Sequence, residues 1–249
     1  MFRPNRFFPV LAISIFSLTV LQTRAQQTQP QSTEQTQAGQ TTSQTPQERA
    51  QVLRQAQERV KARRKVRDQQ IIQDTYTHKY EGYFGGNYLR FRPGDFLQRM
   101  NEAGWHAGIT DYAFGKIGIT ADGRGYYGTT YTGRNPYGVY HPSISQYTFM
   151  GGPTVRLFEG VHWGWTAHVL AGVGHGNFGT GTGGLPPELI GLYKDGNAFN
   201  LTAGASVDYN LSPALALRLT PNYLMSRYGG STQNNLGFTA SVVWRWGRQ

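Results

Sequence analysis

The segment FNLTAGASVDYNL, residues 199–211, alternates apolar with small or polar side chains throughout its length. Its odd positions, from Phe199 to Leu211, are apolar, and its even positions, from Asn200 to Asn210, are small or polar. A period of two sustained over this length predicts a β-strand with one apolar face and one polar face. The segment 235–246 repeats the pattern, and Val243 is its one exception.

Six further segments also read as strands, which brings the predicted number to eight. Their ranges are 80–92, 104–115, 116–126, 145–158, 163–177 and 214–228. In 104–115 the apolar residues keep one face only if the chain bulges near Thr110 or Asp111. Glycines lie on both faces of 80–92, so the pattern assigns no faces to that strand.

The lengths of these segments favour a membrane barrel. They are longer than the ~5–6 residues of most soluble strands and suit the ~9–11 residues with which a tilted strand spans a bilayer. Hydrocarbon cannot satisfy unpaired backbone groups, so such a sheet must close on itself. The predicted fold is all-β: an eight-stranded antiparallel up-and-down transmembrane β-barrel with an N-terminal helical and disordered extension. A soluble β-sandwich, which also alternates, is the alternative.

The connections and the aromatic residues agree with a barrel. Short turns near 115, 159–162 and 212 alternate with longer loops at 93–103, 127–144, 178–196 and 229–234, as in outer-membrane proteins with short periplasmic turns. Rings prefer the interfacial depth of a bilayer. The inner rim of the predicted aromatic girdle comprises Trp163, Trp165, Tyr209, Trp244 and Trp246. Its outer rim comprises Trp105, Tyr126, Tyr147 and Tyr228.

The first 79 residues differ from the rest in composition. Residues 1–25 have the basic start, short apolar stretch and small residues of a signal peptide. Residues 26–46, rich in Gln and Thr, predict a disordered linker. Residues 47–75 are strong helix formers and predict a basic helical segment in the periplasm. The cluster from Lys61 to Arg67 would bind an anionic cell-wall polymer or lipid head groups, or form a solvated face.

Composition excludes several classes of site. The chain has 249 residues and no cysteine, which removes disulfides, thiolate metal sites and cysteine nucleophiles. Its net charge of +10 is concentrated before the predicted barrel, so a nucleic-acid partner is not predicted. The six histidines lack the spacing of a metal site. No catalytic residues, cofactor or metal are therefore predicted.

Alternation also predicts a polar network inside the barrel. The lumen of an eight-stranded barrel is just wide enough for side chains to fill, and charges there must pair. The side chains expected to point inward are Asp122, Arg124, Arg156, His168, Asp208, Arg218 and Arg245. They predict a polar plug, with a gated ion path as the alternative.

The C-terminal segment resembles a known family. The stretches VDYNLSPALALRL, NYLMSRYGG and QNNLGFTASVVWRWG, within 201–247, resemble the closing strands of the small OmpA-like outer-membrane β-barrel family, and YFGGNYLRF and YTFMGGPTVRL resemble its first and fourth strands. The resemblance covers about 80–247. It implies insertion by the outer-membrane assembly machinery, although the chain continues for three residues after the final aromatic, Trp246.

The predicted protein is thus a monomeric, non-enzymatic component of the cell outer membrane with its N-terminal arm in the periplasm. Its expected role is structural or interactive: it would display extracellular loops, contact outer-membrane lipid and tether the envelope through the basic arm. A narrow, porin-like passive pore is the first alternative. A lipid-modifying enzyme is the second, since some eight-stranded barrels carry a His and Ser pair on the outer wall, and His175 is the residue to test.

Overall fold

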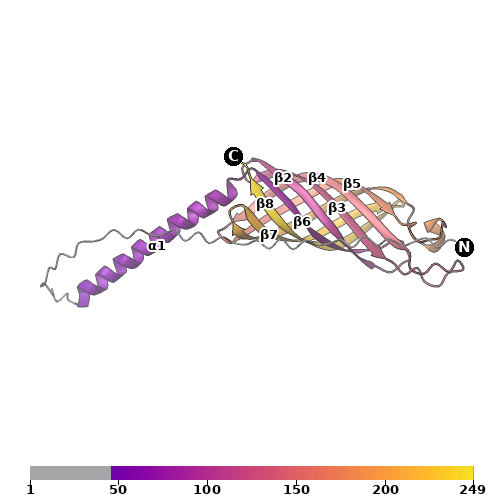
Figure 1. Cartoon of the computed structure of the whole chain (residues 1–249), viewed down its shortest axis with the longest axis horizontal. Helices are drawn as coiled ribbons and strands as arrows, with labels where there is room; N and C mark the ends of the chain where they lie inside the picture. The colour runs from indigo at the N-terminus through magenta and orange to yellow at the C-terminus, as the bar shows by residue number, and fades with distance from the viewer. Residues whose placement is uncertain (1–45, 249) are drawn as a thin grey trace, which may run out of the picture. The chain divides into compact units, whose positions relative to one another are not determined.

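The computed structural model describes residues 46–248, and one closed barrel accounts for most of them (Figure 1). Its elements, in chain order, are the helix α1 (Pro46–Tyr76), the strands β1 (Tyr80–Phe91), β2 (Met100–Phe114), β3 (Ile117–Thr129), β4 (Ser143–Glu159) and β5 (Trp163–Asn177), the short 3-10 helix η1 (Pro187–Ile190), and the strands β6 (Gly196–Ser212), β7 (Leu215–Tyr228) and β8 (Ser231–Trp246). The predicted signal segment, nearly all of the predicted linker and the start of the chain before Pro46 lie outside these residues. No described helix has the length and apolar character that crossing a bilayer requires.

Each strand pairs antiparallel with its sequence neighbours, and β1 also pairs with β8. Tyr80, for example, lies opposite Asp111 on one side and Trp246 on the other. The prediction of an eight-stranded antiparallel barrel is therefore confirmed. Closure leaves no edge strand with unpaired amides, which is the condition for a sheet in hydrocarbon.

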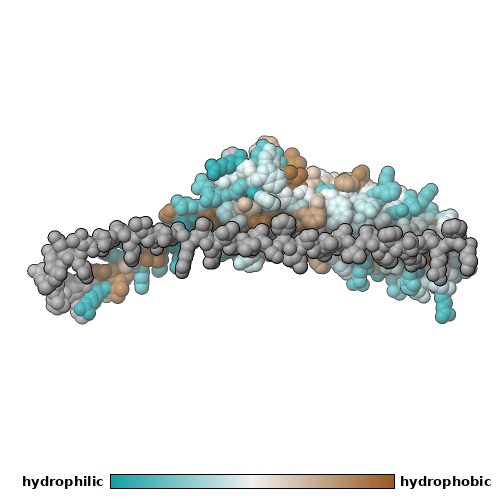
Figure 2. Space-filling view, viewed as in Figure 1, coloured by the Kyte–Doolittle hydropathy of each residue, from teal (hydrophilic) through white to brown (hydrophobic). Residues whose placement is uncertain are grey.

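The two faces of the wall differ as the period of two requires. Along β7 and β8 buried residues alternate with exposed ones at nearly every position. The exposed positions carry large apolar side chains, among them Val169, Leu219 and Trp244. Figure 2 shows apolar residues on the outer surface of the barrel.

One end of the barrel has the short turns and all three irregularities of register. These shifts lie between Asp111 and Phe114, between Arg156 and Phe158, and between Asn210 and Ser212. The first is the bulge predicted for β2. Each shift lies next to a short turn. The regular alternation of inward and outward side chains therefore ends at the shift.

The opposite end differs from the prediction in its last connection. A loop over 229–234 was predicted, but β7 and β8 are joined by Gly229 and Gly230 alone. Both glycines have positive φ, which is what a two-residue hairpin turn requires. The other three connections at this end are long, and they include η1.

Candidate functional site in the barrel lumen

Glu81 is the centre of a buried ion cluster at the short-turn end of the lumen. Its carboxylate accepts hydrogen bonds from Arg156 Nη2 (3.0 Å), Arg218 Nη2 (2.7 Å) and Arg245 Nε (3.1 Å). These partners come from β4, β7 and β8, so one side chain of β1 connects strands on different sides of the barrel. All four side chains are buried.

Asp208 on β6 supplies the second carboxylate of this cluster. It accepts from Arg218 Nε and Nη2, both at 2.7 Å, and from Arg245 Nη2 at 3.0 Å. Asn210 Oδ1 accepts a further bond from Arg245 Nη1 at 2.9 Å. The double contact with Arg218 is the bidentate geometry in which guanidinium and carboxylate pair most strongly.

A second cluster surrounds Asp122 on β3. This carboxylate accepts hydrogen bonds from Arg124 Nε (2.6 Å), His106 Nε2 (2.6 Å) and the Tyr83 hydroxyl (2.9 Å). Between the two clusters is a cavity of about 20 Å³, lined by Asp122 and Arg218 together with a ring of threonines. A space of that size holds about one water molecule.

The end of α1 enters the short-turn mouth of the barrel. Arg156 Nη1 donates to the Tyr76 carbonyl at 2.7 Å, and Arg156 Nη2 donates to the His78 carbonyl at 3.2 Å. Asn210 Nδ2 donates to the Tyr76 hydroxyl at 3.1 Å. Burial raises the pKa of this hydroxyl above its ordinary value.

A glycine makes room for this contact. A Cβ added at Gly164 would lie 2.4 Å from the Tyr76 hydroxyl oxygen, so a larger residue there would displace the ring. The guanidinium of Arg156 also stacks on Tyr112, with 3.5 Å between the guanidinium carbon and the ring centroid. The helix end and the ion cluster are thus joined through Arg156.

The long-loop end of the lumen is apolar. Phe91, Phe178 and Tyr228 pack with ring centroids 5.3–6.1 Å apart. The connection between β5 and β6 contributes several of the buried residues around them: Phe178, Ile190, Leu192 and Tyr193. Below this cluster, Gln146 Nε2 donates to both carboxylate oxygens of Glu102 at 2.9 Å. The connection therefore covers the lumen at this end.

Six of the seven side chains predicted for the lumen are buried: Asp122, Arg124, Arg156, Asp208, Arg218 and Arg245. His168, the seventh, is partly buried and lines the small cavity. The structure divides the six buried side chains between the two clusters, and His168 lies at the cavity between them. Glu81, His106 and Tyr83 also belong to these clusters and were not predicted for the lumen. Charge balance could have indicated a missing acid, since the predicted set had four arginines and two aspartates.

Four tryptophans named for the girdle, Trp163, Trp165, Trp244 and Trp246, are exposed on the wall near the short-turn end. Trp105 is partly exposed, and its Nε1 donates to the Tyr127 hydroxyl at 3.3 Å. Tyr126 and Tyr228, predicted for the outer rim, are instead buried in the lumen. The lumen is apolar at that end, so an aromatic ring there can face inward.

His175 lies exposed on the outer wall of β5, where its Nδ1 is 2.8 Å from Asn197 Oδ1. Among the described residues no serine hydroxyl is hydrogen bonded to this ring. The arrangement lacks the nucleophile and base contact of a hydrolase.

No protein-family model matches the sequence, and no curated protein matches it. The chain is similar to solved structures of outer-membrane proteins. Neisserial surface protein A has a TM-score of 0.50 at 8% identity, over 68% of this chain and 97% of that one. Ail of Yersinia pestis has 0.44 at 15% identity, over 68% and 99%, and OprG of Pseudomonas aeruginosa has 0.47 at 8%, over 70% and 98%. At such identities the likeness concerns the fold alone; membership of the OmpA-like family stays a prediction.

Proposed function

We propose that this protein is a monomeric outer-membrane barrel of structural and interactive type, with a closed lumen and the short-turn end facing the periplasm. The observation that carries the proposal is the Glu81 cluster, which fixes three arginines across the interior of a barrel with an apolar outer wall. The fold shared with Neisserial surface protein A supports the outer membrane as its location. Such a barrel reaches the membrane through the outer-membrane assembly machinery.

The closed lumen is supported at three levels. The mouth contains the end of α1, the middle contains the ion clusters, and the far end contains the apolar cluster. The cavity beside Asp122 has room for about one water molecule. A structural plug explains these contacts better than a passive pore does, because an ion would have to break several buried pairs to pass.

Single-channel recording in planar bilayers tests this part of the proposal. The full-length mature protein should give no steady current. Its heat-modifiable migration on gels shows in the same preparation that the barrel is folded. A steady conductance from folded barrels would support the pore and overturn the plug.

The long loops are the proposed display surface. In the connection between β3 and β4, Asn135 Nδ2 donates to the Val139 carbonyl at 2.6 Å, and Asn135 Oδ1 accepts from the Tyr137 amide at 3.1 Å. These bonds order a loop that exposes Tyr131, Tyr137 and Tyr140. Tyrosines held in a rigid loop bind partners with little loss of entropy.

The basic part of α1 is the proposed envelope tether, with an anionic cell-wall polymer as its partner. Its charges lie on all sides of an exposed helix, which suits a polymer better than a flat lipid surface. Arg156 holds the end of this helix to the barrel, so a load on the arm would reach the wall.

Co-sedimentation with purified peptidoglycan sacculi tests the tether. Replacing Lys61, Arg63, Arg64, Lys65 and Arg67 with Gln should abolish co-sedimentation, whereas replacing Gln55, Gln57 and Gln69 with Ala should leave it unchanged. Equal binding by the two variants would remove the polymer as a partner.

A further inference from the structure

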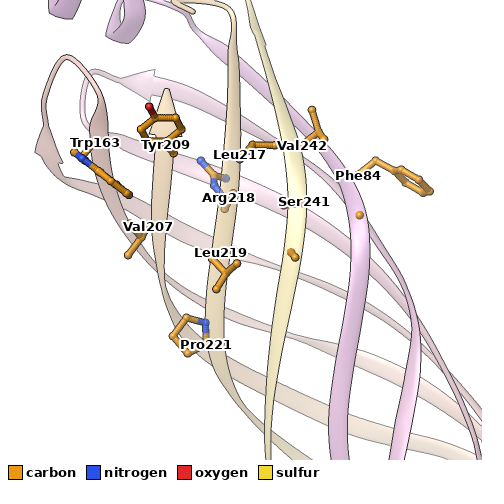
Figure 3. Close-up of a pocket in the computed structure, with 12 residues that line it drawn as sticks. Phe84, Trp163, Val207, Tyr209, Leu217, Arg218, Leu219, Pro221, Ser241 and Val242 are labelled. Atoms are coloured by element: carbon orange, nitrogen blue, oxygen red, sulfur yellow. The ribbon is translucent and has the colours of Figure 1, made fainter. Parts of the chain in front are cut away.

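A groove runs along the outer wall of the barrel over β6, β7, β8 and β1 (Figure 3). Its volume is about 630 Å³, and its outward-facing lining is almost entirely apolar. Trp163 and Tyr209 lie at one end of the groove, and Pro221 lies toward the other. The groove crosses the seam at which the first and last strands close the barrel.

Small residues form the floor of this groove. Gly85 shares the inward face of β1 with Glu81 and Tyr83, so it presents only its backbone to the groove. Gly86, which lies opposite Ala240, is exposed and adds no side chain to the outer face of the seam. Ala240, one strand away, contributes only a methyl group. Phe84, Leu219 and Val242 are exposed around them and form the walls. The depression therefore follows from small residues on the outer face of the seam between larger side chains.

An unpaired cation lies beyond the rim at the end of the same strand. β8 runs from Ala240 past the exposed Trp244 and Trp246, and the chain continues to Arg248. Arg248 is exposed, and none of the ion pairs among the described residues includes it. The Lys79 amide bonds to the Gly247 carbonyl at 3.3 Å, which holds this end of the chain against the start of β1.

The spacing between the groove and Arg248 matches one leaflet. Trp246, the last residue of β8, lies six residues beyond Ala240. At ~3.4 Å per residue these cover roughly 20 Å along the strand, or about 16 Å along the axis of a barrel with strands tilted ~40°. Half of the hydrocarbon core of a bilayer is about 15 Å thick, so Trp246 lies near its boundary and Arg248, two residues further on, lies among the head groups. An acyl chain in the groove would thus place its phosphate near Arg248.

We propose that this groove binds one phospholipid of the periplasmic leaflet, with an acyl chain over Gly85 and Ala240 and the phosphodiester paired with Arg248. The inference rests on the proposed membrane function. A phospholipid matches both the apolar floor and the lone cation. A second copy of the chain would cover the floor but would leave Arg248 without a counter-charge.

The test counts lipids on the full-length mature protein. The protein is refolded into vesicles of phosphatidylglycerol and phosphatidylethanolamine, extracted in a mild detergent and examined by native mass spectrometry. We expect one phospholipid per barrel. Ala240→Leu fills the floor, Arg248→Gln removes the cation, and Ala171→Leu adds the same bulk at an exposed alanine outside the groove.

Ala240→Leu and Arg248→Gln should each reduce lipid retention by about tenfold, the effect of ~1.4 kcal/mol, while Ala171→Leu retains the lipid. A lipid-free wild type, equal retention by Ala240→Leu and Ala171→Leu, or a lipid-free dimer would overturn the inference. Heat-modifiable migration of every variant reports separately on the membrane barrel. A folded barrel without lipid therefore refutes only the groove, and an unmodified migration refutes the proposed function.

Discussion

Glu81 shows why an acid inside a narrow barrel needs several partners. Little water reaches the lumen, so a carboxylate there must be compensated by hydrogen bonds from neighbouring side chains. Three arginines supply them, and Asp208 balances part of their charge. Since these residues belong to five strands, the cluster ties the wall together across its interior.

Glu81→Gln should destabilise the barrel strongly. The amide cannot compensate Arg156, Arg218 and Arg245, and breaking a buried ion cluster costs about 3–5 kcal/mol. Urea unfolding of the protein in vesicles measures the change.

Lys116→Gln is the control for this measurement. Its bond to Glu159 is 3.1 Å long, but the lysine side chain is 62% exposed, and such surface pairs contribute about 0–1 kcal/mol. Equal unfolding free energies for the two variants would show that the Glu81 cluster contributes no special stability.

The lumen residues that lie in strands with clear alternation could be predicted from the sequence. Residues in strands without clear alternation could not. Asp208 and Arg218 lie in strands where apolar and polar residues alternate cleanly, which assigns their faces. Glu81 begins a strand with glycines on both faces, so periodicity carries no signal there. Which three arginines contact Glu81 depends on the distances between strands across the barrel. A single sequence does not contain these distances.

At the scale of elements, the side chain of Asn135 makes several of the hydrogen bonds that order the loop between β3 and β4. Asn135→Ala removes the bonds to Thr132 Oγ1, to the Val139 carbonyl and to the Tyr137 amide. We expect faster tryptic cleavage after Arg134, with no change in the unfolding of the barrel. Asn234→Ala, which removes a single bond to the Tyr223 hydroxyl on the wall, should leave the cleavage rate unchanged.

The helix α1 should loosen when its last residue is shortened. Tyr76→Ala removes the hydroxyl that bonds to Asn210 Nδ2 and, at 3.4 Å, to the Gly160 carbonyl. At ~1 kcal/mol for each of these two hydrogen bonds, opening of the junction and tryptic cleavage after Lys79 should become roughly 30-fold faster. Mass spectrometry detects the fragment that begins at Tyr80. Gln57→Ala, on an exposed part of the helix, is the control, and equal rates would mean that Tyr76 does not anchor the arm.

The bounds of the strands were predicted well because the alternation of apolar and polar residues marks them. The strand bounds agree with the structure to within a few residues, and the bulge in β2 followed from its broken alternation. The turn at Gly229 was predicted too long because polar residues after it, such as Thr232 and Asn234, resemble a loop. In the structure they extend β8 beyond the apolar part of the wall.

At the scale of the whole molecule, the outward-facing residues predict a closed membrane barrel more directly than the inward-facing residues do. The outer positions stay apolar over most of the wall, whereas the inner positions change from charged to aromatic toward the long loops. This change is why Tyr126 and Tyr228 were assigned to the wrong face. A rule that assumes a polar interior fails where a loop covers the lumen.

Val169→Arg tests whether the wall faces lipid. Val169 is 50% exposed in the middle of the outward positions of β5, between Trp165 and Val173. An arginine at the midplane of a bilayer costs about 2–4 kcal/mol in a barrel, which urea unfolding in vesicles resolves. Phe96→Arg, at a loop residue that is 98% exposed, should cost nothing measurable. A wall facing water would tolerate both changes equally, so equal stabilities would place this barrel outside the membrane.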